Sequence, residues 1–300
     1  MTEAARKPWY DIVLNKCIIG PGLHYDEADM ALKPHEDHIL AAGSSSLGLY
    51  DLRRGARLDY NPMLEIRRIR WHPTDGNKLS TSNVRRSYSL WDAKRLEPVI
   101  TVKGEHFQYE HEWQPEGRLL VLACDPGLRL VDPGQGIETS SVAMNDTWIK
   151  LCWMDNNRFA CVNRKETLVN IYDLRSLSQP LVSIDPGIDK PNFIHPWKGG
   201  LLMLNELGRL SRLDDNGQLS LLSDRFERCL EKTNPFIIAE AELVAMPCYD
   251  EVLLCDLNDP DNKRSLPADL EGPHKVVGGH NPPSLVVQDA HRSTIVYSSY

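Results

Sequence analysis

Histidine and carboxylate side chains crowd together at one place in the sequence, and both groups bind metals and transfer protons. Glu105, His106, Glu110, His111 and Glu112 lie within a single short stretch. These residue types could hold zinc or act as general acids and bases. If the stretch is an extended strand, the odd separation of the two histidines places them on opposite faces, so they could not share a metal ion. No His-Glu-x-x-His pattern occurs in the sequence, and we expect no metal.

Motifs of nucleophilic catalysis and of phosphate binding are also missing from the sequence. It contains no Gly-x-Ser-x-Gly elbow, and the glycines at 20–22 and 134–136 are typical of turns rather than of phosphate loops. The 7 cysteines include no Cys-x-x-Cys pair, which argues against a zinc site and against a disulfide framework. We predict that the chain is not an enzyme, has no catalytic residues and uses no cofactor.

Basic side chains give the clearest surface signal. The net charge is −8, which disfavours general nucleic-acid binding, yet residues 51–100 contain 11 Lys or Arg against 6 Asp or Glu, a local excess of +5. Arginine pairs well with carboxylates and phosphates, so this segment predicts a patch for a protein partner with an acidic surface. The alternative is that these side chains are solvated and scattered around the rim. The candidate patch residues are Arg53, Arg54, Arg57, Arg67, Arg68, Arg70, Arg85, Arg86, Lys94 and Arg95.

The elements that must carry these residues repeat along the chain. An aspartate follows a short apolar segment seven times, with successive gaps of 40, 41, 40, 41, 41 and 42 residues. We expect each carboxylate to accept hydrogen bonds from backbone amides of the tight turn that follows it. The repeated residues are Asp11, Asp51, Asp92, Asp132, Asp173, Asp214 and Asp256.

A second register runs in phase with the aspartates. Trp71, Trp113 and Trp153 each precede the next aspartate by about 20 residues, and FIHPW at 193–197 and NPFII at 234–238 fall in the same phase. After each comes a turn and a second apolar segment, which predicts short strands separated by Gly, Pro, Asn and Asp. The expected second strands are 79–82, 119–124, 158–162, 200–205 and 242–247.

A repeat of 40 to 42 residues, with several strands and a closing Trp-Asp at Trp91-Asp92, resembles the blade of a WD40 propeller. The resemblance covers nearly the whole chain and implies one all-β domain, residues 1–300, folded as a seven-bladed WD40-type β-propeller closed by pairing of its N- and C-terminal strands. We expect residues 6–11 to form the outer strand of the last blade and residues 284–300 its two inner strands, so that no sheet edge stays open. Residues 259–280, rich in Asp, Pro and Gly, are expected to form a surface loop inserted in that blade.

Within the propellers, residues 66–256 resemble the coronins in the order of their dissimilar blades. The clearest matches are EWQPEGRLLVLACDPGLRLVDPGQG at 112–136 and VNIYDLRSLSQPLVSID at 169–185. This resemblance implies a non-enzymatic scaffold that binds actin filaments and the cytoskeleton. The first blade is more compressed here than in that family, and no individual actin-contacting residue can be matched.

Two other partner classes are consistent with a WD40-type scaffold. The tetrapeptides that begin at Tyr50, Trp91 and Tyr172 resemble the Trp-Asp-x-Arg box of substrate receptors of cullin-RING ubiquitin ligases. In that case the contacts to the ligase linker subunit would be Arg53, Lys94 and Arg175. The third reading is a subunit of a nuclear complex for RNA processing or ribosome assembly.

The sequence also predicts where the chain resides. It has no apolar stretch of 18 residues, so no membrane association is expected. The first ten residues are polar and lack the apolar core of a signal peptide. We therefore expect an intracellular protein, cytoplasmic or nuclear or both.

Overall fold

The computed structural model shows an all-β propeller fold of small antiparallel sheets, as predicted. The one helical element among the described residues is a short 3-10 turn at Ala239–Ala241, and no helix in that part of the chain is long and apolar enough to cross a membrane. The structure describes residues 13–19, 29–36, 38–43, 46–62, 65–83, 86–103, 108–124, 127–142, 148–163, 167–186, 191–205, 207–214, 216–224, 226, 234–248, 251–267, 275–280, 283–288 and 293–298.

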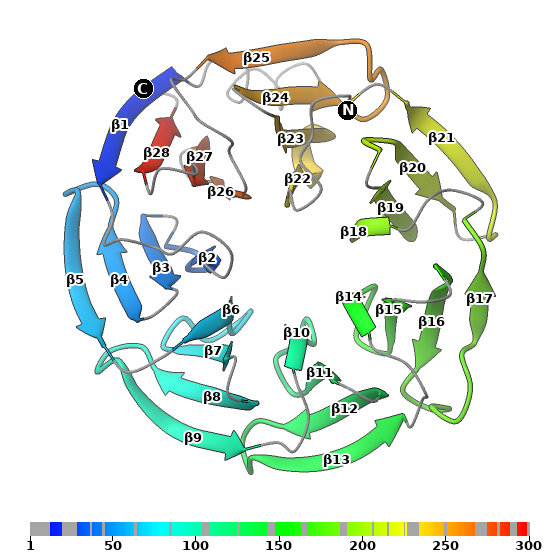
Figure 1. Ribbon diagram of the computed structural model, residues 1–300, viewed down its shortest axis with the longest axis horizontal. Coiled ribbons are helices and arrows are strands. Elements are labelled where there is room, and N and C mark those ends of the chain that lie inside the picture. The colour runs from blue at the N-terminus through cyan, green and yellow to red at the C-terminus, as the bar shows by residue number, and fades with distance from the viewer. Residues whose placement is uncertain are drawn as a thin grey trace. The chain divides into compact units, whose positions relative to one another are not determined.

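Contacts divide the chain into two compact units. The larger one comprises Asp26–Lys190 and Ile194–Gly199 and contains four sheets, each made of four consecutive strands (Figure 1). Its strands are β2 (Asp29–Leu32), β3 (Ile39–Gly43), β4 (Leu47–Asp51) and β5 (Ala56–Asn61); β6 (Ile66–Trp71), β7 (Lys78–Asn83), β8 (Ser87–Asp92) and β9 (Glu97–Lys103); β10 (Gln108–Trp113), β11 (Leu120–Cys124), β12 (Gly127–Asp132) and β13 (Ile137–Val142); β14 (Trp148–Trp153), β15 (Arg158–Asn163), β16 (Val169–Asp173) and β17 (Val182–Ile184).

The other unit comprises Met1–Tyr25, Pro191–Phe193 and Gly200–Tyr300. The described residues form two further sheets of four consecutive strands. They also form one antiparallel sheet that combines strands from both ends of the sequence, which we call the terminal sheet. The consecutive strands are β18 (Pro191–Trp197), β19 (Gly200–Asn205), β20 (Leu210–Leu213) and β21 (Leu219–Ser223); β22 (Phe236–Ile238), β23 (Leu243–Pro247), β24 (Glu251–Asp256) and β25 (Lys263–Pro267). The terminal sheet contains β26 (Lys275–His280), β27 (Pro283–Gln288), β28 (Ser293–Ser298) and β1 (Val13–Ile19).

The terminal sheet joins strands from the two ends of the sequence. β1 pairs antiparallel with β28, from Val13 opposite Ser298 to Ile19 opposite Ser293. Strands β27 and β28 are the two middle strands of this sheet, where residues 284–300 were expected to supply them. Residues 6–11, expected as the fourth strand, lie outside the described residues, and the apolar segment VLNKCII of β1 takes that position.

The segment 259–280 is not the continuous surface loop that its composition predicted. It contains β25, which pairs with β24, and β26, which pairs with β27. The loop prediction was wrong for these strands. Asp, Pro and Gly favour a loop, but pairing with β24 and β27 holds these short segments as strands. One of its glycines serves close packing instead, since a Cβ on Gly278 would lie 2.2 Å from Cε1 of the Phe236 ring.

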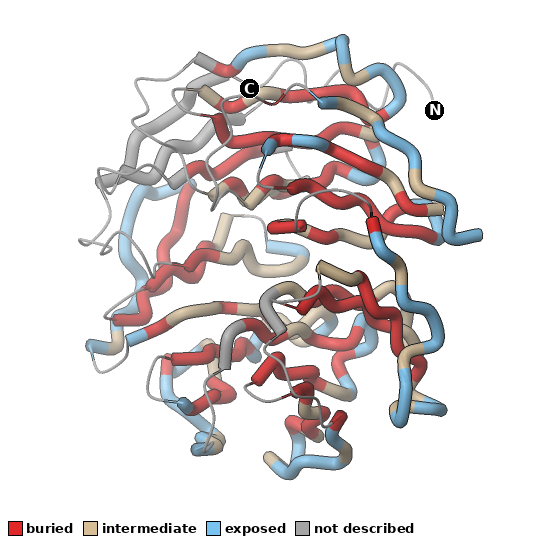
Figure 2. The backbone as a smooth tube through the Cα atoms, turned by 45° about the vertical axis from the view of Figure 1, so that its right-hand side comes forward, coloured by how far each residue is buried: buried red, intermediate tan, exposed pale blue. Residues whose placement is uncertain are grey.

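Burial follows position in the sheet. The second and third strands of a sheet are mostly buried, whereas the fourth strands are largely exposed (Figure 2). The predicted second strands are confirmed as β7, β11, β15, β19 and β23. Tryptophans at the ends of first strands bond to the first strand of the preceding sheet. Trp71 Nε1 donates to the Ala31 carbonyl at 2.9 Å, and Trp153 Nε1 donates to the Glu112 carbonyl at 3.1 Å. Each of these bonds spans about one repeat of sequence.

Candidate functional site

The repeated aspartates hold the backbone of the turns after the third strands. Asp51 Oδ1 accepts hydrogen bonds from the amides of Arg53 and Arg54, at 2.9 and 3.1 Å. Asp92 Oδ1 accepts from the amides of Lys94 and Arg95 in the same way, at 2.8 and 3.3 Å. A carboxylate that accepts two amides fixes a tight turn. The predicted capping role is confirmed in these turns.

The same arrangement recurs after the later third strands, with different side chains. Asp132 Oδ1 accepts from the amide of Gly134 at 2.7 Å, and the amide two residues beyond Asp173, Asp214 and Asp256 donates in the same way. Asp11 lies outside the described residues. Among the turns that the structure describes, only those after β4 and β8 place two consecutive basic residues on this frame, as DLRR and DAKR.

We call Arg53–Arg54 and Lys94–Arg95 the paired basic turns. All four residues are exposed. The side chain of Arg54 is 78% exposed although its Nε lies 3.4 Å from Asp51 Oδ2, so solvent still reaches the guanidinium. Two adjacent sheets of one unit therefore present the same kind of basic pair on the same kind of rigid turn.

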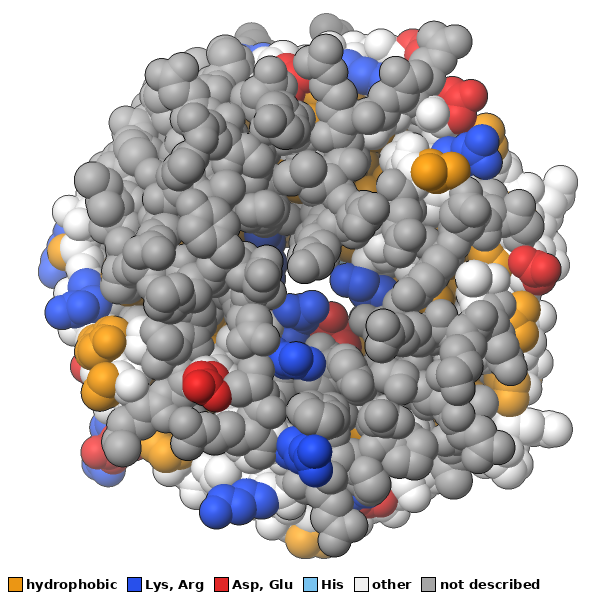
Figure 3. Space-filling model, in the orientation of Figure 1, with side chains coloured by type: hydrophobic (Ala, Val, Ile, Leu, Met, Phe, Trp, Pro, Cys, Tyr) orange, Lys and Arg blue, Asp and Glu red, His pale blue; other side chains and the backbone are white. Residues whose placement is uncertain are grey.

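The remaining basic candidates do not join one continuous patch. Arg86 immediately precedes β8 and Lys94 follows it, so the two lie at opposite ends of a six-residue strand, about 20 Å apart. Arg57 lies on the exposed strand β5 over the Tyr60 ring, at 4.8 Å. Arg85 lies outside the described residues. Figure 3 shows Lys and Arg side chains on one face, some close together and others apart.

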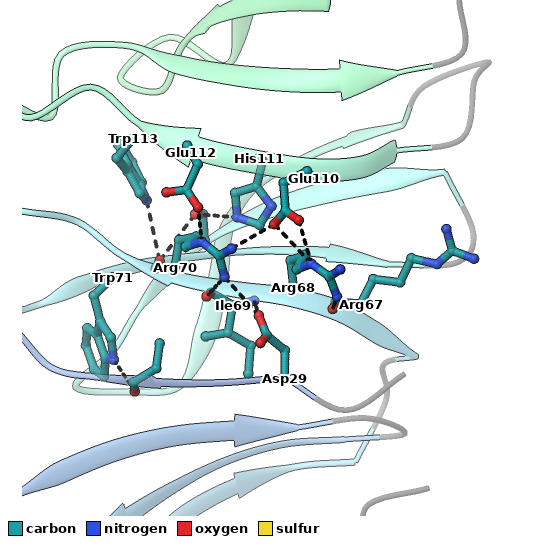
Figure 4. Close-up of polar contacts among 12 residues, drawn as sticks. Asp29, Arg67, Arg68, Ile69, Arg70, Trp71, Glu110, His111, Glu112 and Trp113 are labelled. Atoms are coloured by element: carbon teal, nitrogen blue, oxygen red, sulfur yellow. Dashed lines mark hydrogen bonds and ion pairs between the residues drawn. The ribbon is translucent and has the colours of Figure 1, made fainter. Parts of the chain in front are cut away.

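Two of the predicted patch residues are engaged inside the larger unit. Arg70 lies among three carboxylates: its Nη1 is 3.0 Å from Asp29 Oδ2, its Nη2 is 2.7 Å from Glu110 Oε1 and its Nε is 2.5 Å from Glu112 Oε1 (Figure 4). Arg68 Nε lies 3.0 Å from both oxygens of Glu110. We call these five residues the arginine cluster. It joins β2, β6 and β10, and so connects three sheets.

The charges of the arginine cluster set the protonation of its acids. Burial acts to raise the pKa of Glu110, but the charges of Arg68 and Arg70 outweigh it and hold the pKa at about 2. Burial raises the pKa of Glu112 above its usual value, and Arg70 offsets this only in part. Burial also acts to lower the pKa of Arg70, yet Glu112 and Glu110 raise it overall. Both guanidinium groups are therefore paired with carboxylates of the same chain.

His111 lies beside the arginine cluster, and its imidazole is fully buried. Its Nε2 is 2.9 Å from Ser80 Oγ on β7. Burial, reinforced by the charge of Arg70, lowers the pKa of His111 to about 3, so the ring is neutral at pH 7. His106, its neighbour in the sequence, lies outside the described residues. Among the described residues, no group of histidine, cysteine and carboxylate side chains could hold a metal ion.

The sequence contains a signal for the arginine cluster in the spacing of its charged residues. Arg68 and Glu110 are 42 residues apart, as are Arg70 and Glu112, and this spacing equals one repeat. Charges of opposite sign at equivalent positions of consecutive repeats lie on neighbouring first strands. The basic residues of this segment thus divide between exposed surface turns and partly buried ion pairs.

Arg175, the third candidate for a ligase contact, pairs with the aspartate of its own turn. Its Nε is 2.8 Å from Asp173 Oδ1 and its Nη2 is 2.5 Å from Asp173 Oδ2. The side chain is nevertheless 80% exposed. Contact of Arg53, Lys94 and Arg175 with a ligase linker stays a prediction. In comparisons with known proteins, no protein-family model and no curated protein sequence matches this chain.

Proposed function

We propose that this chain is a non-enzymatic WD40-type scaffold that binds a protein partner with an acidic surface through the paired basic turns. The observation that carries the proposal is the repeated geometry of Asp51 and Asp92, each of which fixes the backbone of two exposed basic residues. Turns held on a rigid sheet lose little conformational entropy on binding. Basic pairs on such turns suit carboxylates on a partner.

The WD40 assignment rests on features of single repeats. Asp residues recur every 40 to 42 positions, and in the sheet β6–β9 the Trp91 Nε1 donates to Thr81 Oγ1 at 2.9 Å, a Thr-Trp contact expected of a WD40 blade. β1 and β28, which lie near the two ends of the chain, pair in one sheet with β27 and β26. We propose that this sheet closes a seven-bladed propeller.

Binding to an acidic peptide tests the proposal. A fluorescent 20-residue polyglutamate peptide is titrated with the wild-type chain and with a variant carrying Arg54→Glu, Lys94→Glu and Arg95→Glu, at 50 and 150 mM salt. The expected result is binding by the wild type that weakens with salt and is lost in the variant. Equal binding by a matched control with Arg118→Glu, Arg129→Glu and Arg158→Glu is expected, and loss in that control as well would contradict the role of the turns.

Actin filaments test the narrower, coronin-like form of the proposal. Co-sedimentation is measured with the same three proteins at low and moderate salt. Pelleting of the wild type and the control, but not of the paired-turn variant, supports a filament partner. If the wild type binds the acidic peptide but does not pellet with filaments, the scaffold proposal stands and the actin assignment is wrong.

A further inference from the structure

A buried histidine lies at the interface between the sheet β6–β9 and the sheet β10–β13. His111 on β10 is 0% exposed, and its Nε2 lies 2.9 Å from Ser80 Oγ on β7 of the neighbouring sheet. Among the described residues, its Nδ1 has no hydrogen-bond partner. A neutral ring satisfies the bond to Ser80, whereas a protonated ring carries a second N–H that needs an acceptor.

The charges around His111 oppose its protonation. Figure 4 shows the ring next to Arg70 and beside the other residues of the arginine cluster, among them Arg68 and Glu110. Arg70 and Arg68 on β6 disfavour an added positive charge, and Glu110 on the same strand as His111 favours it. The nearby carboxylates already accept hydrogen bonds from the arginines, because Glu110 and Glu112 bond to Arg68 or Arg70.

Other charged groups face the same layer from the strands on either side. Asp29 on β2 accepts from Arg70 Nη1 and from the Ile69 amide, at 3.0 and 2.7 Å. Lys150 on β14 acts on the carboxylate of Glu110 as a third positive charge. Two arginines and a lysine thus balance three carboxylates, and a proton on His111 would add an uncompensated charge to a buried layer.

We propose that the interface between these two sheets is an acid-sensitive seam, and that protonation of His111 opens it. At neutral pH the neutral ring bridges β10 to Ser80 while the arginine cluster bridges β6 to β10. When the interface separates, water reaches the ring and the imidazole takes up a proton. The pKa of His111 is about 3 in the closed state, against about 6.5 for a hydrated histidine, so acid favours the open state.

The direction and size of the effect follow from linkage. A group whose pKa is depressed in the closed state stabilises that state above its free pKa, and the stabilisation is lost as the pH falls through 6.5 toward 3. Between pH 7 and pH 5, a shift from about 6.5 to about 3 raises the opening equilibrium constant roughly 25-fold.

Hydrogen exchange at pH 7.0 and 5.0, corrected for the intrinsic pH dependence of amide exchange, tests the seam. We expect amides of β7 and β10 to lose roughly 25-fold in protection at pH 5.0, while those of β23 and β24 in the other unit change less. The loss should be absent in His111→Gln, whose side chain does not titrate. It should persist in His35→Gln, which removes an exposed turn histidine. Equal loss in His111→Gln, or unchanged protection in the wild type, would overturn the proposal.

A second measurement covers the case in which His111→Gln does not fold. Histidine-selective 15N NMR of the wild-type chain follows the protonation of His111 directly. We expect the ring to stay neutral well below pH 6 and its titration to coincide with loss of protection in β7 and β10. Titration near pH 6.5 with both strands still protected would contradict the seam.

Discussion

Arg70 is the residue whose replacement most clearly tests the internal electrostatics. It lies within 3.0 Å of oxygens on Asp29, Glu110 and Glu112, and its side chain is 23% exposed. Arg70→Met keeps much of the side-chain volume but leaves the three carboxylates without this cation. Breaking a buried ion pair by removing one partner costs about 3–5 kcal/mol. A domain is typically stable by about 5–15 kcal/mol, so the variant should lose a large share of its stability.

Urea unfolding at pH 7 measures this cost, with Arg129→Met as the control. Arg129 Nη1 pairs with Glu138 Oε2 at 2.9 Å, but the two side chains are 34% and 38% exposed, and such surface pairs contribute about 1 kcal/mol or less. The penalty of Arg70→Met should shrink at pH 5.5, because the unpaired Glu112 can then take up a proton. A second change, Glu112→Leu, should restore part of the stability for the same reason. If Arg70→Met costs no more than Arg129→Met, the arginine cluster does not connect the sheets as argued.

Three further changes test single features of the fold. Asp92→Ala removes the acceptor of two turn amides and should cost about 1–2 kcal/mol by urea unfolding, with Asp92→Asn milder because it keeps an acceptor; equal costs would argue against the cap. Gly117→Ala places a Cβ 2.1 Å from the His72 ring at a φ of +76°, whereas Gly217→Ala, at a φ of +81°, meets nothing within 4 Å, so the first should lower Tm by several degrees more than the second. Deletion of residues 1–19 removes β1 from its pairing with β28 and should expose to hydrogen exchange those amides of β28 that point to β1, while those that point to β27 stay protected; unchanged protection of the first set would contradict the terminal sheet.

The repeated elements could be predicted from the sequence because their signals are local. Each repeated aspartate among the described residues caps a turn within its own repeat, so the spacing alone predicts the third strands and their turns. The arginine cluster could not be found from a linear run of basic residues, because the arginines of β6 are alike in burial. Only the carboxylates one repeat away explain the positions of Arg68 and Arg70. Residues 259–280 were misread for a related reason: β25 and β26 are short strands held by pairing with β24 and β27, and tertiary pairing of this kind overrides composition.

The measurement that tests the central claim most directly is affinity purification of the chain from cells with quantitative mass spectrometry, at 75 and 300 mM salt. The wild type is compared with the variant Arg54→Glu, Lys94→Glu and Arg95→Glu and with the control Arg118→Glu, Arg129→Glu and Arg158→Glu, after all three are shown to have the same Tm. The account predicts acidic partner proteins that the wild type and the control recover at 75 mM salt and that the paired-turn variant loses. Recovery of the same partners by all three proteins would contradict it.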